Sequence, residues 1–166
     1  MRRAFISGFD GSAGTAVITS KENLLWTDGR YWLQASKQLS EDWVTMKDRL
    51  AETPTVEDWL CTTLSKGDSV GIDPWLVSTA VADKYKNTFD KHGIHLVSLH
   101  QNPVDTVWDA MGRKQPLKHP ALVQPVSLAG VGTSEKLTGI REKLAKEGAT
   151  ALIVSALDEV AWLFNV

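Results

Sequence analysis

The chain has 166 residues, enough for one ordinary domain, or for one domain and part of another. Hydrophobic residues make up 43% and charged residues 23%, so a buried core is expected and extensive disorder is not. The net charge of −2 gives no electrostatic reason to expect a nucleic acid or an anionic membrane as a partner. Cys61 is the single cysteine, so an internal disulfide is excluded and a reduced, intracellular setting is favoured. No apolar run approaches the roughly 18 residues of a membrane span.

Short apolar runs alternate with helical patterns along the first two thirds of the chain, which predicts an α/β domain with a mixed sheet. The predicted strands are 14–19, 24–27, 43–47, 70–73 and 94–99. The predicted helices are 31–39, 54–66, 79–92 and 103–111.

Helix-start and helix-stop residues support these assignments. Pro54 suits the first position of a helix that Thr53 can cap, and Asn102-Pro103 opens another helix in the same way. Gly93 suits the exit of the helix between them.

The composition changes at residue 113, where three prolines and several basic residues occur without a clear period. We interpret residues 1–112 as the first domain, 113–130 as a linker and 131–166 as the first elements of a second domain. Past the linker the pattern predicts a helix from Thr133, a strand at 151–155 and a helix at 156–163. A lone helix–strand–helix cannot bury its own apolar faces, so this second domain is expected to be incomplete.

Few residues of the chain are arranged in a pattern that indicates reactivity. His92, His95 and His100 are close in sequence, but His95 and His100 are five residues apart on a strand and point to opposite faces, which argues against a metal site. Cys61 lies beside an apolar helix face and is interpreted as a buried structural thiol. The glycine-rich segments match no phosphate-binding pattern.

Three aspartates, Asp10, Asp28 and Asp73, each adjoin a predicted strand. Such acids can hold Mg²⁺ for phosphoryl transfer. Turn chemistry at Asp28-Gly29 and Asp73-Pro74 is the favoured interpretation. Residue chemistry alone therefore indicates an α/β domain with no visible active site.

Five segments in order and in register closely resemble the eukaryotic-type, three-domain aminopeptidases P, the Xaa-Pro aminopeptidases. Together they span essentially the whole chain. They are residues 2–16, 25–35, 53–60, 70–74 and 156–165.

The resemblance implies a creatinase N-terminal-like, ribonuclease-H-like fold, a mixed sheet flanked by helices that is incomplete here because the family's leading helix, strand and helix are missing. In the family a third domain carries two Mn²⁺ ions and removes the N-terminal residue that precedes a proline. The first two domains shape access to that site and support a homodimer. We therefore expect a non-catalytic fragment of a cytoplasmic metallo-aminopeptidase, with no metal or catalytic residue in this chain, and leave open whether the chain acts as an enzyme.

The Asp10-Gly11-Ser12 loop and Arg30 are the candidates for facing a neighbouring active site, where Arg30 would meet a substrate carboxylate or an acid of another domain. A local ion pair of Arg30 within the Asp28-Gly29 turn is the competing interpretation. The alternative function is a stand-alone creatinase-like module that binds other proteins, and a nuclease built on the three aspartates is a third. An open sheet edge also predicts that the chain is marginally stable and self-associates.

Overall fold

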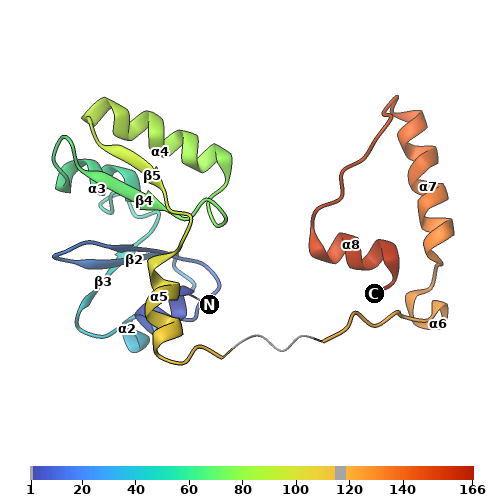
Figure 1. Ribbon diagram of the computed structural model, residues 1–166, viewed down its shortest axis with the longest axis horizontal. Helices are drawn as coiled ribbons and strands as arrows, with labels where there is room; N and C mark the ends of the chain where they lie inside the picture. Colours follow the sequence, from blue (N-terminus) through green and yellow to red (C-terminus); the bar gives the residue numbers. More distant parts are fainter. Residues whose placement is uncertain (1, 115–118) are drawn as a thin grey trace. The chain divides into compact units, whose positions relative to one another are not determined.

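A computed structural model describes residues 2–114 and 119–166 (Figure 1). The chain divides into two compact units, Met1–Lys114 and Gln115–Val166, and each unit is treated by itself. The predicted linker, 113–130, lies partly outside the described residues.

The first unit alternates strands with helices, as the sequence predicts. Its strands are β1 (Thr15–Ile18), β2 (Asn23–Thr27), β3 (Trp43–Lys47), β4 (Ser69–Ile72) and β5 (His95–Ser98). Its helices are α1 (Arg2–Ser7), α2 (Trp32–Gln38), α3 (Val56–Thr63), α4 (Thr79–His92) and α5 (Pro103–Ala110).

The strands form two sheets. In the first, β2 lies in the middle, antiparallel to β1 and parallel to β3, so the predicted mixed sheet is confirmed. The second sheet pairs β4 with β5 in parallel. Four of the five β2 residues are buried, from Leu24 to Thr27, because this strand is covered on both faces.

Strand β1 separates two hydrophobic cores, because successive side chains of a strand point to opposite faces. Ala16 packs on the core of Phe9, Leu25 and Ala35. Its neighbour Val17 packs on the core formed by α3, α4 and Ile94. The alternation at β1 thus places one apolar residue in each core.

Capping residues define the helix ends. Ser78 caps α4 through its hydroxyl, and Gly93 ends that helix in the left-handed conformation (φ 69°) that glycine adopts without a Cβ clash. Asn102 caps α5 and Pro103 is its first residue, as predicted. The start predicted for α3 is wrong by two residues, because the cap is Thr55, whose hydroxyl accepts a hydrogen bond from the Asp58 backbone N–H.

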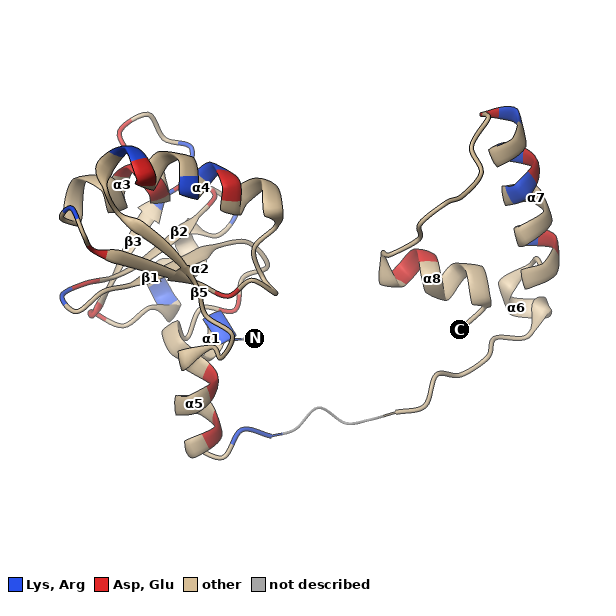
Figure 2. Ribbon diagram, turned by 45° about the horizontal axis from the view of Figure 1, so that its top comes forward, with Lys and Arg blue, Asp and Glu red and all other residues tan. Residues whose placement is uncertain are grey.

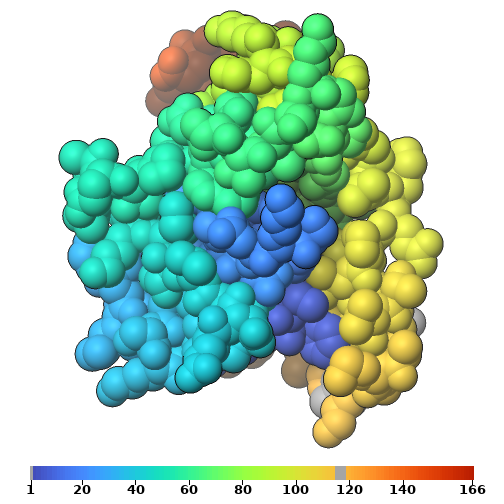
Figure 3. All heavy atoms as spheres, turned by 90° about the vertical axis from the view of Figure 1, so that its left-hand side faces the viewer, coloured from blue at the N-terminus to red at the C-terminus, as the bar shows by residue number. Residues whose placement is uncertain are grey.

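Helix α1 was not predicted from the hydrophobic pattern. It is only 6 residues long and packs against α5, at the other end of the unit. Figure 3 shows this dark-blue segment beside the yellow residues of α5. A helix this short depends on tertiary contacts rather than on its own propensity.

The second unit contains α6 (Val126–Ala129), α7 (Thr133–Lys146) and α8 (Leu157–Phe164). Helix α6 falls within the segment predicted as a linker. The strand predicted at 151–155 is wrong: these residues form no strand, because among the described residues no other strand of this unit is present to pair with them. Figure 2 shows the charged residues of α7 spaced along the helix. Over the ranges that the structure covers, no helix has the length and apolar character needed to cross a membrane.

Candidate functional site

The loop that carries Asp10 and Ser12 is held from beneath by Arg3. The Arg3 guanidinium donates hydrogen bonds to the backbone carbonyls of Gly11 and Gly14. It also lies over the ring of Phe9, 5.3 Å from the ring centre, and Phe9 is fully buried. One cation thus fixes both sides of the loop, which places Asp10 and Ser12 at its exposed surface.

Tyr31 brings two of the predicted residues together. Its hydroxyl shares a hydrogen bond with the Ser12 hydroxyl, and the guanidinium of Arg30 lies 5.1 Å from the centre of its ring. The buried Phe9 ring meets the Tyr31 ring edge-on at 6.0 Å. The Tyr31 ring therefore links the loop to the start of α2.

Asp10 is bound to α2 as well. Its carboxylate accepts hydrogen bonds from Gln34 at 2.7 Å and Gln38 at 2.8 Å. These two glutamines are four residues apart and so lie on one face of the helix. Together with Tyr31, the residue that precedes α2, they hold Asp10 and Ser12 of the loop. We call Asp10, Ser12, Arg30, Tyr31, Gln34 and Gln38 the α2 cluster.

Arg30 is also paired with Asp28. Its Nε and Nη2 atoms donate to the two carboxylate oxygens at 2.9 and 2.8 Å, so the local ion pair considered from the sequence is present. These hydrogen bonds lower the pKa of Asp28 to about 2, and the charge of Arg49 acts in the same direction. Asp28 therefore stays a carboxylate at any physiological pH, and it holds Arg30 in place at the surface.

A shallow cavity of about 500 Å³ adjoins this ion pair. Its rim carries two guanidinium groups, from Arg30 and Arg49. Arg49 has a φ of 70°, an uncommon backbone conformation for a residue with a side chain. Lys47 lies nearby, with its ammonium 5.5 Å from the centre of the Trp32 ring, and Trp32 lines the cavity. Asp28 and Asp48 also line this cavity, so its two guanidinium groups are balanced by two carboxylates and the lining carries no net charge.

The three aspartates considered for Mg²⁺ make separate local contacts. Asp10 bonds to α2 and Asp28 to Arg30, while Asp73 accepts from the Asn102 side chain at 2.9 Å and from the Trp75 backbone N–H. Across residues 2–114 and 119–166, no three histidine, cysteine, aspartate or glutamate side chains gather in a way that could hold a metal ion. The donor set for a two-metal centre is therefore not found among these residues, and no metal-dependent step can be derived from them.

Asp10, Ser12 and Arg30 are predicted from the sequence as site residues, whereas the residues that position them are not. Tyr31, Gln34 and Gln38 follow one another at spacings of three and four residues, which is the signal of a shared helix face. Arg49 gave no such signal, because it lies in a loop after β3.

Profiles of one known domain family match most of this chain. The family profile described as Creatinase/Prolidase N-terminal domain matches residues 2–107, and a second profile of that description matches residues 112–166. Over the described residues the fold is that expected of such a domain, with a mixed sheet and flanking helices. The chain belongs to the creatinase/prolidase N-terminal domain family.

Individual relatives of this chain are described as Xaa-Pro aminopeptidases, X-prolyl aminopeptidases or aminopeptidases P. A probable Xaa-Pro aminopeptidase P from Neurospora crassa is 50% identical over 99% of this chain, and aminopeptidase P1 from Arabidopsis thaliana is 45% identical over 99% of it. The crystal structure of an X-prolyl aminopeptidase from Caenorhabditis elegans, described as a cytosolic enzyme with a di-nuclear active site, matches 99% of the chain at 38% identity with a TM-score of 0.86. The chain spans only 24 to 26% of the length of these three relatives.

Proposed function

We propose that this chain is the non-catalytic region of a proline-specific metallo-aminopeptidase, a region that shapes access to the active site and supports a homodimer. The substrates of the whole enzyme would be peptides with proline in the second position. The two metal ions, Mn²⁺ in the aminopeptidases P that the chain resembles, would be held by another part of that enzyme. A cytoplasmic location fits this proposal, since the Caenorhabditis elegans relative is described as cytosolic.

One observation carries the proposal. Identity of 45 to 50% runs along 99% of the chain, yet the chain spans only about a quarter of each of these relatives. Identity at this level along the whole chain supports a shared role. We place the domain boundaries, as predicted, at 1–112, 113–130 and 131–166.

Within this proposal, the α2 cluster faces the peptide or an acidic group of the neighbouring catalytic part. Asp10, Ser12 and Arg30 are all exposed, and each is held by a side-chain hydrogen bond: Asp10 to Gln34, Ser12 to Tyr31 and Arg30 to Asp28. An ordered, exposed guanidinium is suited to meet a carboxylate, because little side-chain freedom remains to be lost on binding.

A domain exchange tests the proposal. In the Caenorhabditis elegans enzyme, the matching region would be replaced by this chain, and release of the N-terminal residue from an Xaa-Pro peptide would be measured with Mn²⁺. We expect the exchanged enzyme to be active and the purified 166-residue chain to show no turnover above buffer. Chelator-sensitive turnover by the chain alone would overturn the assignment.

The same exchanged enzyme tests Arg30. The Arg30→Ala variant should raise the KM for the Xaa-Pro peptide several-fold, whereas Lys21→Ala, an exposed charge in the β1–β2 turn, should leave it unchanged. Equal KM values for both variants would show that Arg30 serves only its ion pair with Asp28.

A stand-alone protein-binding module is the second candidate, and Trp75 favours it. This tryptophan is 86% exposed in the turn between β4 and α4, beside Leu76 at 63%. Exposed tryptophan is enriched at binding hot spots. A protein that this chain retains in a pull-down at moderate salt, and that Trp75→Ala no longer retains, would support the module. Together with an inactive exchanged enzyme, this result would favour the module over the aminopeptidase region.

A further inference from the structure

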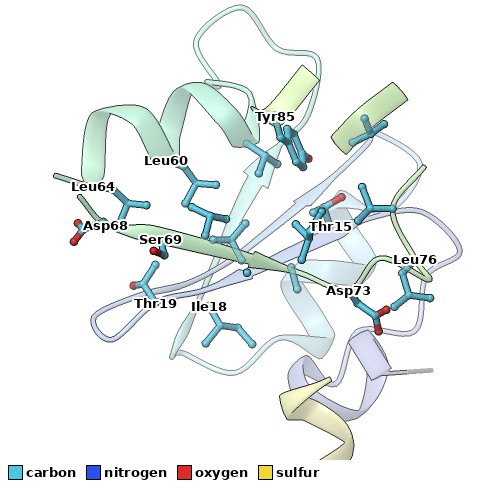
Figure 4. Close-up of a pocket in the computed structure, with 18 of the residues that line it drawn as sticks. Thr15, Ile18, Thr19, Leu60, Leu64, Asp68, Ser69, Asp73, Leu76 and Tyr85 are labelled. Atoms are coloured by element: carbon cyan, nitrogen blue, oxygen red, sulfur yellow. The ribbon is translucent and has the colours of Figure 1, made fainter. Parts of the chain in front are cut away.

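Two cavities of the first unit differ in the chemistry of their lining. The groove of about 930 Å³ between β1 and β4 is lined mainly by uncharged side chains, among them Leu60 (Figure 4). The cavity of about 500 Å³ beside the Arg30–Asp28 ion pair has a different lining, in which charged side chains meet an aromatic ring. Its volume falls within the range of small-molecule sites in proteins, about 300–1,000 Å³. The residues that line it are Asp28, Gly29, Arg30, Trp32, Asp48, Arg49 and Leu50.

The four charged side chains of this smaller cavity are not equivalent. Arg30 and Asp28 neutralise each other through hydrogen bonds of 2.9 and 2.8 Å between the guanidinium and the carboxylate. Asp48 and Arg49, in contrast, take part in no ion pair within residues 2–114 and 119–166. The lining therefore offers one carboxylate and one guanidinium, from neighbouring residues, that can still pair with a ligand.

Arg49 occupies a backbone position at which glycine or asparagine is usual. The Leu50 N–H donates to the Lys47 carbonyl at 3.3 Å, which closes a turn directly after β3. Arg49 is the third residue of this turn and has a φ of 70°. A residue with a Cβ is strained in that conformation, which is why glycine and asparagine predominate there. An exposed arginine in a strained turn indicates that its side chain has a role beyond the fold.

The charges and the apolar wall of the cavity together select a class of ligand. Because the charges of the lining cancel, neither a phosphate-bearing anion nor a simple cation gains net attraction from it. A molecule that carries an ammonium and a carboxylate side by side can pair with Asp48 and Arg49 at the same time. Trp32 and Leu50 provide the apolar wall, and the Trp32 ring is fixed because its Nε1 donates to the Thr27 carbonyl at 2.9 Å. This wall favours an apolar side chain on the same molecule.

We propose that this cavity binds a free apolar α-amino acid in its zwitterionic form. The ligand's carboxylate pairs with Arg49, its ammonium pairs with Asp48, and its side chain packs against Trp32 and Leu50. Free amino acids are also the product of the proposed aminopeptidase, so the site would bind the product class of that enzyme. The link to the product rests on the proposed function. The binding itself does not, since it needs neither metal nor turnover and is measured on the purified chain.

The first experiment compares three probes by ligand-observed NMR on the 166-residue chain: L-leucine, N-acetyl-leucine and leucinamide. Because the cavity is shallow and the ligand small, we expect L-leucine to bind with a Kd on the order of 1 mM. N-acetyl-leucine lacks the ammonium and leucinamide lacks the carboxylate, so each should bind at least tenfold more weakly.

Each other outcome of this comparison contradicts the proposal. If N-acetyl-leucine bound as well as leucine, the site would recognise only a carboxylate. If leucinamide did so, the site would recognise only a cation. An absence of saturable leucine binding would show that the cavity is not an amino-acid site.

The second experiment places the ligand with variants that keep the fold. Arg49→Gly removes the guanidinium and relieves the backbone strain, which offsets the greater freedom of glycine in the unfolded chain. It should therefore melt close to the unsubstituted chain, as circular dichroism would verify, and yet bind leucine at least tenfold more weakly. Asp48→Asn should weaken leucine binding to a similar degree. Lys21→Ala, which changes an exposed charge in the β1–β2 turn, is the control and should bind like the unsubstituted chain. Unchanged binding by a folded Arg49→Gly chain would overturn the proposal.

Discussion

Arg2 and Asp105 form a two-point ion pair between α1 and α5, although 103 residues separate them in the chain. Arg2 donates through Nε to one carboxylate oxygen at 2.8 Å and through Nη2 to the other at 2.7 Å. Arg113 adds a third hydrogen bond to Asp105 at 2.7 Å. This carboxylate thus receives two arginines and ties the first helix of the unit to the last.

The pairing predicts an acid-sensitive stability. Hydrogen bonds from Arg2, together with the charges of Arg2 and Arg113, hold the pKa of Asp105 below its usual value of 3.8. A carboxyl whose pKa is lower in the folded state stabilises the fold above its unfolded-state pKa, and this contribution is lost as the pH falls through the folded-state value. Asp105→Asn should therefore be less stable than the unsubstituted chain at pH 7, and the difference should shrink as the pH falls below about 4.

Urea unfolding between pH 2 and 7, followed by tryptophan fluorescence, measures this difference. Trp108 is a suitable reporter, since it stacks on Phe5 at 4.8 Å in the same α1–α5 junction. Asp83→Asn is the control, an exposed aspartate on α4 for which no ion pair occurs within the described ranges. A stability difference for Asp105→Asn that stays constant with pH would mean that the pair contributes packing rather than charge.

Helices α1 and α5 differ in how far they can be predicted from the sequence. Local signals predict the end of α4 and the start of α5, because Gly93, Asn102 and Pro103 act within one turn of those helix ends. Helix α1 has no such signal, since it is stabilised by contacts with residues about one hundred positions away. The strand predicted at 151–155 failed for the opposite reason: its composition is right, but a strand needs a partner, and composition does not provide one.

In the candidate site, too, contacts between sequence neighbours are predictable and contacts between distant residues are not. The Asp28-Gly29 turn and the ion pair of Arg30 within it are predictable from the sequence, because Asp28 and Arg30 are only two residues apart. Contacts between the 10–12 loop and α2 join residues about 20 positions apart, such as Ser12 and Tyr31, and only the folded chain shows them.

Burial predicts a contrast between two leucines of the first unit. Leu25 is fully buried in the β2 core, whereas Leu33 on α2 is 70% exposed. Leu25→Ala should lower the free energy of unfolding by about 2–5 kcal/mol, since it removes buried methyl groups and leaves a cavity. Leu33→Ala should change it by less than about 0.5 kcal/mol. Equal effects in urea unfolding would mean that the core around Leu25 is not formed in solution.

Alanine substitutions at two glycines are expected to change the stability in opposite directions. A Cβ at Gly11 would come within 2.3 Å of the Phe9 ring, which is fully buried and cannot move aside, so Gly11→Ala should destabilise the chain by about 1–3 kcal/mol. A Cβ at Gly139, inside α7, meets nothing within 4 Å. Gly139→Ala should stabilise its helix by up to about 1 kcal/mol, the difference in helix propensity. Amide hydrogen exchange resolves both changes, and protection that rises in the 8–14 loop of Gly11→Ala would contradict the predicted clash.

Hydrogen bonds of Lys136 and Asn165 are expected to stabilise the second unit. The buried Lys136 ammonium donates to the Trp162 carbonyl at 2.6 Å and to the Asn165 side chain, and Asn165 in turn donates to the Val131 carbonyl at 3.1 Å. Asn165 also ends α8 in the left-handed conformation, with a φ of 55°.

Two variants of Asn165 separate the contribution of its side-chain hydrogen bonds from that of its left-handed backbone conformation. Asn165→Gly keeps the left-handed backbone but loses both side-chain hydrogen bonds, so it should destabilise α7 and α8 by about 1–3 kcal/mol. Asn165→Ala loses the same bonds and adds the strain of a Cβ in that conformation, and it should be less stable than Asn165→Gly by about a further 1 kcal/mol. Hydrogen exchange of the α7 amides gives both values in the full chain. If the two variants were equally stable, backbone strain at the end of α8 would play no part; if Asn165→Gly matched the unsubstituted chain, the contact with Lys136 would contribute nothing.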